Sequence, residues 1–139
     1  TWSYPFTPET VLNRIQARSR ADSVMHYWFS VLEGKNFIGS ALLFGGEGKG
    51  MEIGYSIAQV AAGRGLASES ARALCNFGFR TLGLKRITAR VSTDNPASQK
   101  VMEKLGFQQH PGEKMDWSEH YGTNTPLHHY SLTRERFQP

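Results

Sequence analysis

The most informative stretch of this chain runs from Met51 to Ala67, MEIGYSIAQVAAGRGLA. Its first half alternates apolar with other residues, which predicts a β-strand over Met51 to Ile57. Its second half, Ala62-Gly63-Arg64-Gly65-Leu66-Ala67, is poor in bulky side chains and runs straight into a predicted helix. Backbone N–H groups in such a turn can approach a phosphate closely, and the start of a helix adds unpaired N–H groups and a dipole. The stretch therefore predicts a cradle for the phosphates of a cofactor.

Length and composition indicate one domain spanning residues 1–139, because 39% of the chain is hydrophobic and 20% is charged. No apolar run approaches the roughly 18 residues of a membrane span. The N-terminal residues show no basic region followed by an apolar core, so we see no secretory signal in them. The single cysteine, Cys75, excludes an internal disulfide and fits a reducing compartment. We expect a soluble, cytoplasmic protein without a membrane partner.

The net charge of +4 suits an anionic partner, although it does not separate nucleic acid from a phosphorylated cofactor. Positive residues gather between Ala62 and Lys104, around the predicted cradle. An ordinary solvated surface explains any single one of them equally well. Because the chain lacks the interleaved aromatics of a stacking platform, we expect no nucleic-acid partner.

Upstream of the cradle, the pattern predicts a helix followed by an antiparallel meander. Thr10 to Arg20 carries amphipathic spacing and follows a capping signal. Two β-rich runs, Val24 to Leu32 and Phe37 to Phe44, are joined by a hairpin turn and precede the strand from Met51 to Ile57. Short turns between three consecutive strands favour antiparallel pairing.

Downstream of the cradle, the pattern predicts a β-α-β crossover. The apolar stripe of the predicted helix comprises Leu66, Ser70, Ala73, Leu74 and Phe77, and Gly83 is placed to end that helix. Ile87, Ala89 and Val91 then alternate with polar residues, as in a strand with one buried face. A crossover of this length makes the new strand parallel to the one from Met51.

A second signature follows, in which Asn95 and Pro96 open a short helix and Gly106 ends it. Val101 and Leu105 supply its buried stripe. Beyond it, Gln108 to Leu127 is polar and interrupted by Pro and Gly, so we interpret it as a long loop or an irregular hairpin before a last strand over His128 to Thr133. This segment and the helix from Thr10 to Arg20 are expected to border a substrate.

Together, EIGYSIAQVAAGRGLASESARALCNFGF and LKRITARVSTDNPASQKVMEKLGF resemble the GNAT superfamily of acetyl-CoA-dependent N-acetyltransferases, and its RimJ/RimL-like branch in particular. The resemblance covers Met51 to Phe107. It implies an α/β (α+β) fold with a mixed, mostly antiparallel sheet flanked by helices, in which the β-α-β crossover forms the acetyl-CoA site. Members of the superfamily usually have another strand and helix before the segment that begins here, so either the chain is truncated or it lacks a first strand.

The resemblance implies that acetyl-CoA is held mainly by backbone amides of the cradle. The implied contacts are Ile57, Ala62, Gly63, Arg64, Gly65, Leu66, Ala67, Asn95 and Ser98. Ala62 departs from the family pattern, which has Arg or Gln at that position, and Arg64 is expected to supply charge instead. Asn95 would bind the pantetheine arm by the same resemblance, whereas simple helix capping explains it equally well.

Direct attack by a neutral amine on the acetyl thioester, as the resemblance implies, requires a base and an acid. Glu52, on the strand face opposite Ile53 and Tyr55, is the candidate base, acting through water, with a solvated carboxylate as the alternative. Ser98 resembles the serine proposed to protonate the sulfur, with capping as the alternative. Tyr130 is a further candidate acid, with an aromatic core residue as the alternative.

Other chemistries fit the sequence less well. The histidines show no His-x-x-x-His spacing and only one cysteine is present, so we expect no metal site. Cys75 lies in an apolar stretch and is interpreted as a buried helix residue rather than a nucleophile. A dinucleotide fingerprint fails because its third glycine would fall at Ser68.

The sequence therefore predicts an acyltransferase that moves an acetyl group from acetyl-CoA to a primary amine, favouring a protein or peptide N-terminal amine. Two alternatives are a non-catalytic acetyl-CoA-binding sensor or docking module, and an acetyltransferase for a small amine such as a polyamine. The sequence leaves both a monomer and a homodimer open.

Overall fold

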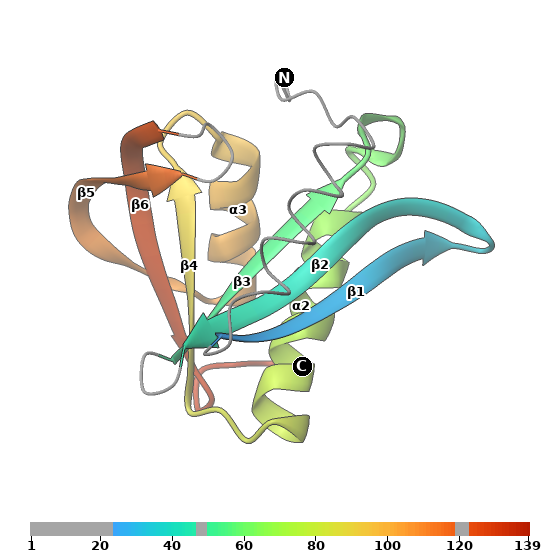
Figure 1. Ribbon diagram of the computed structural model, residues 1–139, viewed down its shortest axis with the longest axis horizontal. Helices are drawn as coiled ribbons and strands as arrows, with labels where there is room; N and C mark the ends of the chain where they lie inside the picture. Colours follow the sequence, from blue (N-terminus) through green and yellow to red (C-terminus); the bar gives the residue numbers. More distant parts are fainter. Residues whose placement is uncertain (1–23, 47–49, 119–122) are drawn as a thin grey trace.

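The computed structural model describes residues 24–46, 50–118 and 123–139. These residues form a six-stranded sheet with the strand order β1-β2-β3-β4-β6-β5, and two α-helices lie on one of its faces (Figure 1). In chain order the elements are β1 (Val24–Glu33), β2 (Asn36–Gly46), β3 (Gly50–Ile57), the 3-10 turn η1 (Gln59–Ala61), α2 (Leu66–Asn76), the π-helical turn η2 (Phe77–Thr81), β4 (Arg86–Ser92), α3 (Pro96–Leu105), β5 (Gln108–Ser118) and β6 (Thr123–Thr133). The helix predicted over Thr10 to Arg20 lies outside the described residues. None of the helices described is long and apolar enough to span a membrane.

The first three strands form the predicted antiparallel meander. Glu33 pairs with Asn36 at the tip of the β1–β2 hairpin, where Gly34 adopts a φ of 61° that suits glycine. β2 continues antiparallel to β3, with Leu43 opposite Ile53. The long β1–β2 hairpin extends to one side of the molecule in Figure 1.

β3 and β4 are parallel neighbours over a very short distance. Only two residue pairs join them, Met51 with Ile87 and Glu52 with Thr88. Beyond these pairs the two strands diverge toward their carboxyl ends, as Figure 1 shows. α2 and η2 make the connection between them, so the predicted crossover is confirmed. The region between the two diverging strands, on the side of the helix starts, is called the wedge below.

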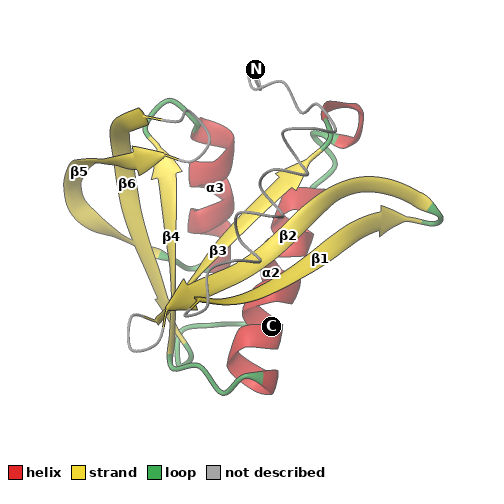
Figure 2. Cartoon of the chain, viewed as in Figure 1, coloured by secondary structure: helices red, strands yellow, loops and turns green. Residues whose placement is uncertain are grey.

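The core lies between the sheet and the two helices, which are drawn in red in Figure 2. Ile87, Ala89 and Val91 of β4 are buried there, as predicted. The stripe predicted for α2 is wrong at Ala73, which is exposed, whereas Ala71 and Cys75 are fully buried. Small residues let the helix approach the sheet closely, and a Cβ on Gly78, in the next turn, would lie 2.8 Å from Ile87 Cδ1.

The C-terminal part is a hairpin, so the irregular-hairpin interpretation of Gln108 to Leu127 is confirmed and the long-loop interpretation is wrong. β5 and β6 are antiparallel, and their register shifts between Gln109 and Glu113. Gly112, with a φ of 78°, lies in this irregular stretch. The strand therefore continues past Pro111, and β6 begins well before the predicted start at His128.

Candidate active site

The predicted cradle lies at the start of α2 and is open. Gly63 and Gly65 both have left-handed φ values, 77° and 76°, and Gly65 caps the helix without any side-chain hydrogen bond. A Cβ added to either glycine would meet no atom within 4 Å. The first backbone N–H groups of an α-helix have no partner inside the helix, so this end offers donors to an anion. Ile57, the last residue of β3, and the exposed Ala62 lead into the cradle.

Arg64, between the two glycines, points to the β1–β2 hairpin. Its Nη1 and Nη2 donate to the Glu33 carboxylate at 2.7 and 3.3 Å. Both side chains are about half exposed, at 50% and 49%. The charge expected to serve the phosphates is therefore already paired with a carboxylate in this structure.

The start of α3 lies at the far side of the wedge. The Asn95 side-chain oxygen accepts a hydrogen bond from the Ser98 backbone N–H at 3.1 Å, with Pro96 in the first turn. Gly106 ends the helix with a φ of 86°, and the Phe107 N–H donates to the Met102 carbonyl. The capping interpretation of Asn95 is thus confirmed, and it leaves the amide NH₂ of Asn95 outside the cap.

A contact between Tyr55 and Ser98 spans the wedge from β3 to α3. The Tyr55 hydroxyl is buried and forms no hydrogen bond of good geometry. Burial raises the pKa of Tyr55, and the nearby Ser98 side chain partly opposes that rise. Tyr55 and Ser98 therefore form a polar pair between the diverged elements, and the sequence had not indicated a functional role for Tyr55.

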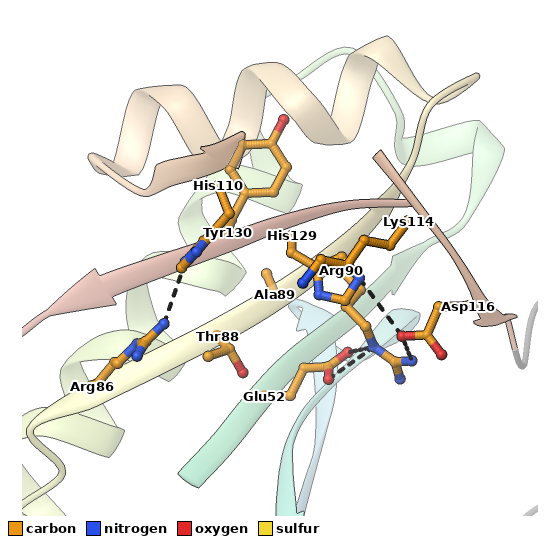
Figure 3. A pocket seen from close by; sticks show the side chains of 10 residues that line it. All are labelled: Glu52, Arg86, Thr88, Ala89, Arg90, His110, Lys114, Asp116, His129 and Tyr130. Atoms are coloured by element: carbon orange, nitrogen blue, oxygen red, sulfur yellow. Dashed lines mark hydrogen bonds and ion pairs between the residues drawn. The ribbon is translucent and has the colours of Figure 1, made fainter. Parts of the chain in front are cut away.

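Glu52 lies at the closed end of the wedge, on the sheet face away from the helices. Arg90 Nε donates to both Glu52 oxygens at 3.0 Å, and Arg90 Nη1 donates to Asp116 Oδ2 at 3.4 Å (Figure 3). His129 Nε2 lies 3.6 Å from the same Asp116 oxygen. Glu52 and Arg90 are largely buried, with side chains 21% and 27% exposed. The carboxylate is therefore fixed in place rather than freely solvated.

The charges of this cluster shift two pKa values. Burial opposes the charge on Arg90, but Glu52 and Asp116 outweigh it and raise the pKa of Arg90. Burial lowers the pKa of His129, and the opposing attraction of Asp116 does not restore it. His129 is therefore expected to be neutral at pH 7, leaving Arg90 as the cation that Glu52 and Asp116 share.

A pocket of about 400 Å³ surrounds Glu52 and is called the Glu52 pocket below. Its lining comes from β3, β4, β5 and β6 (Figure 3). The lining residues are Glu52, Arg86, Thr88, Ala89, Arg90, His110, Lys114, Asp116, His129 and Tyr130. A cofactor cradle at the open end of a strand wedge and a polar pocket at its closed end suit a reaction between two bound molecules.

The sequence of residues 1–108 matches the family described as the acetyltransferase (GNAT) domain. The chain belongs to the GNAT acetyltransferase family. The predicted RimJ/RimL-like branch and the predicted GNAT fold are both confirmed.

Curated relatives of this GNAT domain include two proteins of Bacillus subtilis. The uncharacterized N-acetyltransferase YoaA is 39% identical over 85 residues, which cover 61% of this chain and 48% of YoaA. The putative ribosomal N-acetyltransferase YdaF is 31% identical over 87 residues, covering 63% of this chain and 47% of YdaF. The chain thus spans about half the length of the curated relatives it matches.

Solved structures share the GNAT fold over almost the whole chain. A GNAT-family acetyltransferase from Bacillus anthracis superimposes with a TM-score of 0.73 at 28% identity, covering 94% of this chain and 76% of the other. RimJ of Mycobacterium smegmatis, solved in complex with CoA-disulfide, gives 0.72 at 23% identity, with 91% and 61% covered. A chimera of the Vibrio cholerae spermidine N-acetyltransferase SpeG gives 0.74 at 21% identity, with 94% and 80% covered. At 23% and 21% identity, the similarities to RimJ and to the SpeG chimera show a shared fold alone.

Tyr130, predicted as a candidate acid, belongs to the core of the GNAT domain. It is 2% exposed and its hydroxyl donates to Gln109 Oε1 at 3.3 Å. Figure 3 shows its ring pointing toward α3, away from Glu52 and Arg90. Burial raises the pKa of Tyr130, with a further contribution from Glu103. This placement supports the alternative interpretation of Tyr130 as an aromatic core residue.

Cys75 is fully buried in α2, as predicted. Burial raises the pKa of its thiol to about 12, so little thiolate forms near neutral pH. In the part of the chain that the structure describes, no three His, Cys, Asp or Glu side chains are grouped to hold a metal ion.

Proposed function

We propose that this GNAT domain transfers an acetyl group from acetyl-CoA to a primary amine. The acceptor that we favour is the N-terminal amine of a protein or peptide. The observation that carries the proposal is the wedge between β3 and β4. Pairing stops after Glu52 and Thr88, and the uncapped start of α2 lies beyond the open end. The RimJ structure with CoA-disulfide supports a coenzyme A ligand for this fold.

The residues of the cradle fit the pyrophosphate of acetyl-CoA. Residues 62–65 form an exposed turn before α2, and the space beside Gly63 and Gly65 is open. Backbone N–H groups there would hold the phosphates, helped by the helix dipole. Asn95 would use its free amide NH₂ to bind the pantetheine arm, and Ile57 would contact its apolar part.

The proposed reaction is a direct transfer in a ternary complex. Glu52 takes a proton from the acceptor ammonium through water, which leaves the nitrogen lone pair free to attack. The N–C bond forms and the C–S bond breaks. The departing thiolate takes a proton from the Ser98 hydroxyl, and Ser98 is reprotonated through water by the second proton that the attacking nitrogen loses as it becomes an amide. The products are the N-acetylated amine and free coenzyme A, and holding both reactants in one wedge lowers the entropic part of the barrier.

Relatives support two acceptor classes. YdaF is named as a putative ribosomal N-acetyltransferase, and SpeG as a spermidine N-acetyltransferase. The RimJ/RimL-like branch favours the protein N-terminus over the polyamine. We also place the protein in the cytoplasm in this proposal, since Cys75 is a free, buried thiol.

A non-catalytic acetyl-CoA sensor is the second candidate, and the cradle is the observation that favours it. Ala62 replaces the Arg or Gln of the family pattern, and Arg64 is paired with Glu33. Both features weaken charged contacts to the phosphates without removing the backbone donors.

One experiment separates these functions. Purified protein is given acetyl-CoA with free-amine peptides, amino acids or polyamines, and release of free thiol is measured. We expect release with peptides that have a free N-terminus. Calorimetric binding of coenzyme A without thiol release from any acceptor would support the sensor, and release only with polyamines would support the small-amine enzyme.

A further inference from the structure

The Glu52 pocket contains more cationic than anionic side chains. Its acidic groups are Glu52 and Asp116, and its permanent cations are Arg86, Arg90 and Lys114. Among these, Arg90 is bound to both carboxylates, at 3.0 Å from Glu52 and 3.4 Å from Asp116. Both acidic groups therefore contribute to one shared ion-pair cluster.

Arg86 and Lys114 are not part of that cluster. Across the described ranges, no ion pair joins either of them to a carboxylate. Arg86 Nη2 instead lies 3.3 Å from His110 Nε2, which is 3.0 Å from Ser131 Oγ. This contact places the Arg86 guanidinium at the edge of the pocket, where the side chain is exposed and has no carboxylate partner among the described residues.

The charged side chains that act on His129, which also lines the pocket, include the same cations. Burial lowers the pKa of His129, the attraction of Asp116 opposes that shift, and Lys114, Arg90 and His110 each lower the pKa further. A positive potential in a concave site attracts anions and disfavours ligands with several positive charges.

We propose that the Glu52 pocket binds a carboxylate that the acceptor carries close to its amine, with Arg86 and Lys114 as its partners. This inference rests on the proposed acetyltransferase function and specifies its substrate class. The amine lies toward Glu52, and the carboxylate lies toward Arg86 and Lys114. A peptide with a free N-terminus and an acidic second residue meets both requirements. A polyamine would instead bring additional cations beside Arg86 and Lys114.

The test uses three peptides with a free N-terminus that differ only at the second residue, which is Asp, Asn or Lys, together with spermidine. Two quantities are measured for each: kcat/KM with acetyl-CoA, and calorimetric binding to protein saturated with coenzyme A. We expect the Asp peptide to exceed the Asn peptide at least about fivefold in both measurements. The Lys peptide and spermidine should be poorer than the Asn peptide.

Variants identify the groups responsible. Arg86→Gln combined with Lys114→Gln should bring the Asp and Asn peptides to within about twofold of each other. Lys35→Gln, an exposed change in the β1–β2 turn, is the matched control and should keep the Asp preference. If the double variant keeps the full preference, Arg86 and Lys114 do not form the subsite.

The outcomes separate this inference from the proposed function. Transfer with equal kcat/KM for the Asp and Asn peptides, or faster transfer to spermidine, would overturn the inference and keep the enzyme. Absence of transfer to every acceptor would overturn the proposed function. In that case calorimetry still tests the carboxylate site. The proposal is contradicted if neither peptide binds, or if the Asp and Asn peptides bind with equal affinity.

Discussion

Arg90 donates its Nε–H to both carboxylate oxygens of Glu52 at 3.0 Å, joining β3 to β4 at the point where their backbone pairing ends. The contact replaces missing backbone hydrogen bonds with a charged pair that is largely buried. It fixes the candidate base at the closed end of the wedge, while the cradle lies at the open end. The base and the cofactor site are thereby positioned by the same two strands.

Glu52→Gln tests the base. The amide keeps an oxygen for Arg90 but cannot take a proton, so we expect kcat to fall about 100-fold while coenzyme A affinity changes less than about twofold. Steady-state kinetics and calorimetry measure the two effects. Glu113→Gln, an exposed change on β5, is the control and should leave both values unaltered. An unchanged kcat for Glu52→Gln would reduce Glu52 to an ion-pair partner of Arg90.

Ser98→Ala tests the proton donor beside Tyr55. Because the cap uses the Ser98 backbone N–H and not its hydroxyl, the helix start should survive the change. We expect kcat to fall at least about tenfold with little effect on the melting temperature. Equal kcat values for wild type and Ser98→Ala would assign Ser98 to capping alone.

Glu33→Gln tests the pairing of Arg64. Removing the carboxylate frees Arg64 for the phosphates and deletes a negative charge near the cradle. We expect coenzyme A to bind about two- to fivefold more tightly, since an exposed pair of this kind contributes about 0.2–1 kcal/mol. The gain should shrink as salt rises. Weaker binding would instead mean that Glu33 holds the cradle in its binding shape.

Asn95→Ala tests the cap of α3. Loss of the hydrogen bond to the Ser98 N–H should lower the free energy of unfolding by about 1 kcal/mol, measured by urea denaturation. Asn95→Asp keeps an acceptor oxygen and should retain most of the stability. If both variants lose the same free energy of unfolding, the lost stability does not come from the hydrogen bond of the cap.

Local signals account for the parts of the fold that the sequence predicted well. The turn at Gly34, the Asn95 cap and the Gly106 stop each act within a few residues, so they can be recognised in a single sequence. The parallel relation of β3 and β4 follows from the length of the crossover. Glu52, Ser98 and the cradle were predicted from the strand and the helix starts that such signals define, and their roles in the reaction stay predictions.

The rest of the site depends on contacts between distant segments. Alternation in β4 puts Arg90 on the face opposite Ile87 and Ala89, but its pairing with Glu52 needs the short β3–β4 register. Asp116 reaches the cluster only because β5 continues past the irregular stretch at Gly112. The buried face of α2 was misjudged because small residues pack closest to the sheet, which hydrophobicity alone does not reveal.

Calorimetric titration of coenzyme A into the wild type and two variants at one position, Gly65→Asn and Gly65→Asp, tests whether residues 62–67 bind the phosphates of coenzyme A. Asn and Asp are similar in size and both tolerate the left-handed φ of 76° at Gly65 better than most residues, so the pair isolates the added charge. We predict that the wild type binds one coenzyme A, that Gly65→Asn binds it more weakly, and that Gly65→Asp loses at least about tenfold more affinity. Absence of binding by the wild type, or equal affinities for the Asn and Asp variants, would contradict the assignment of residues 62–67 as the phosphate cradle.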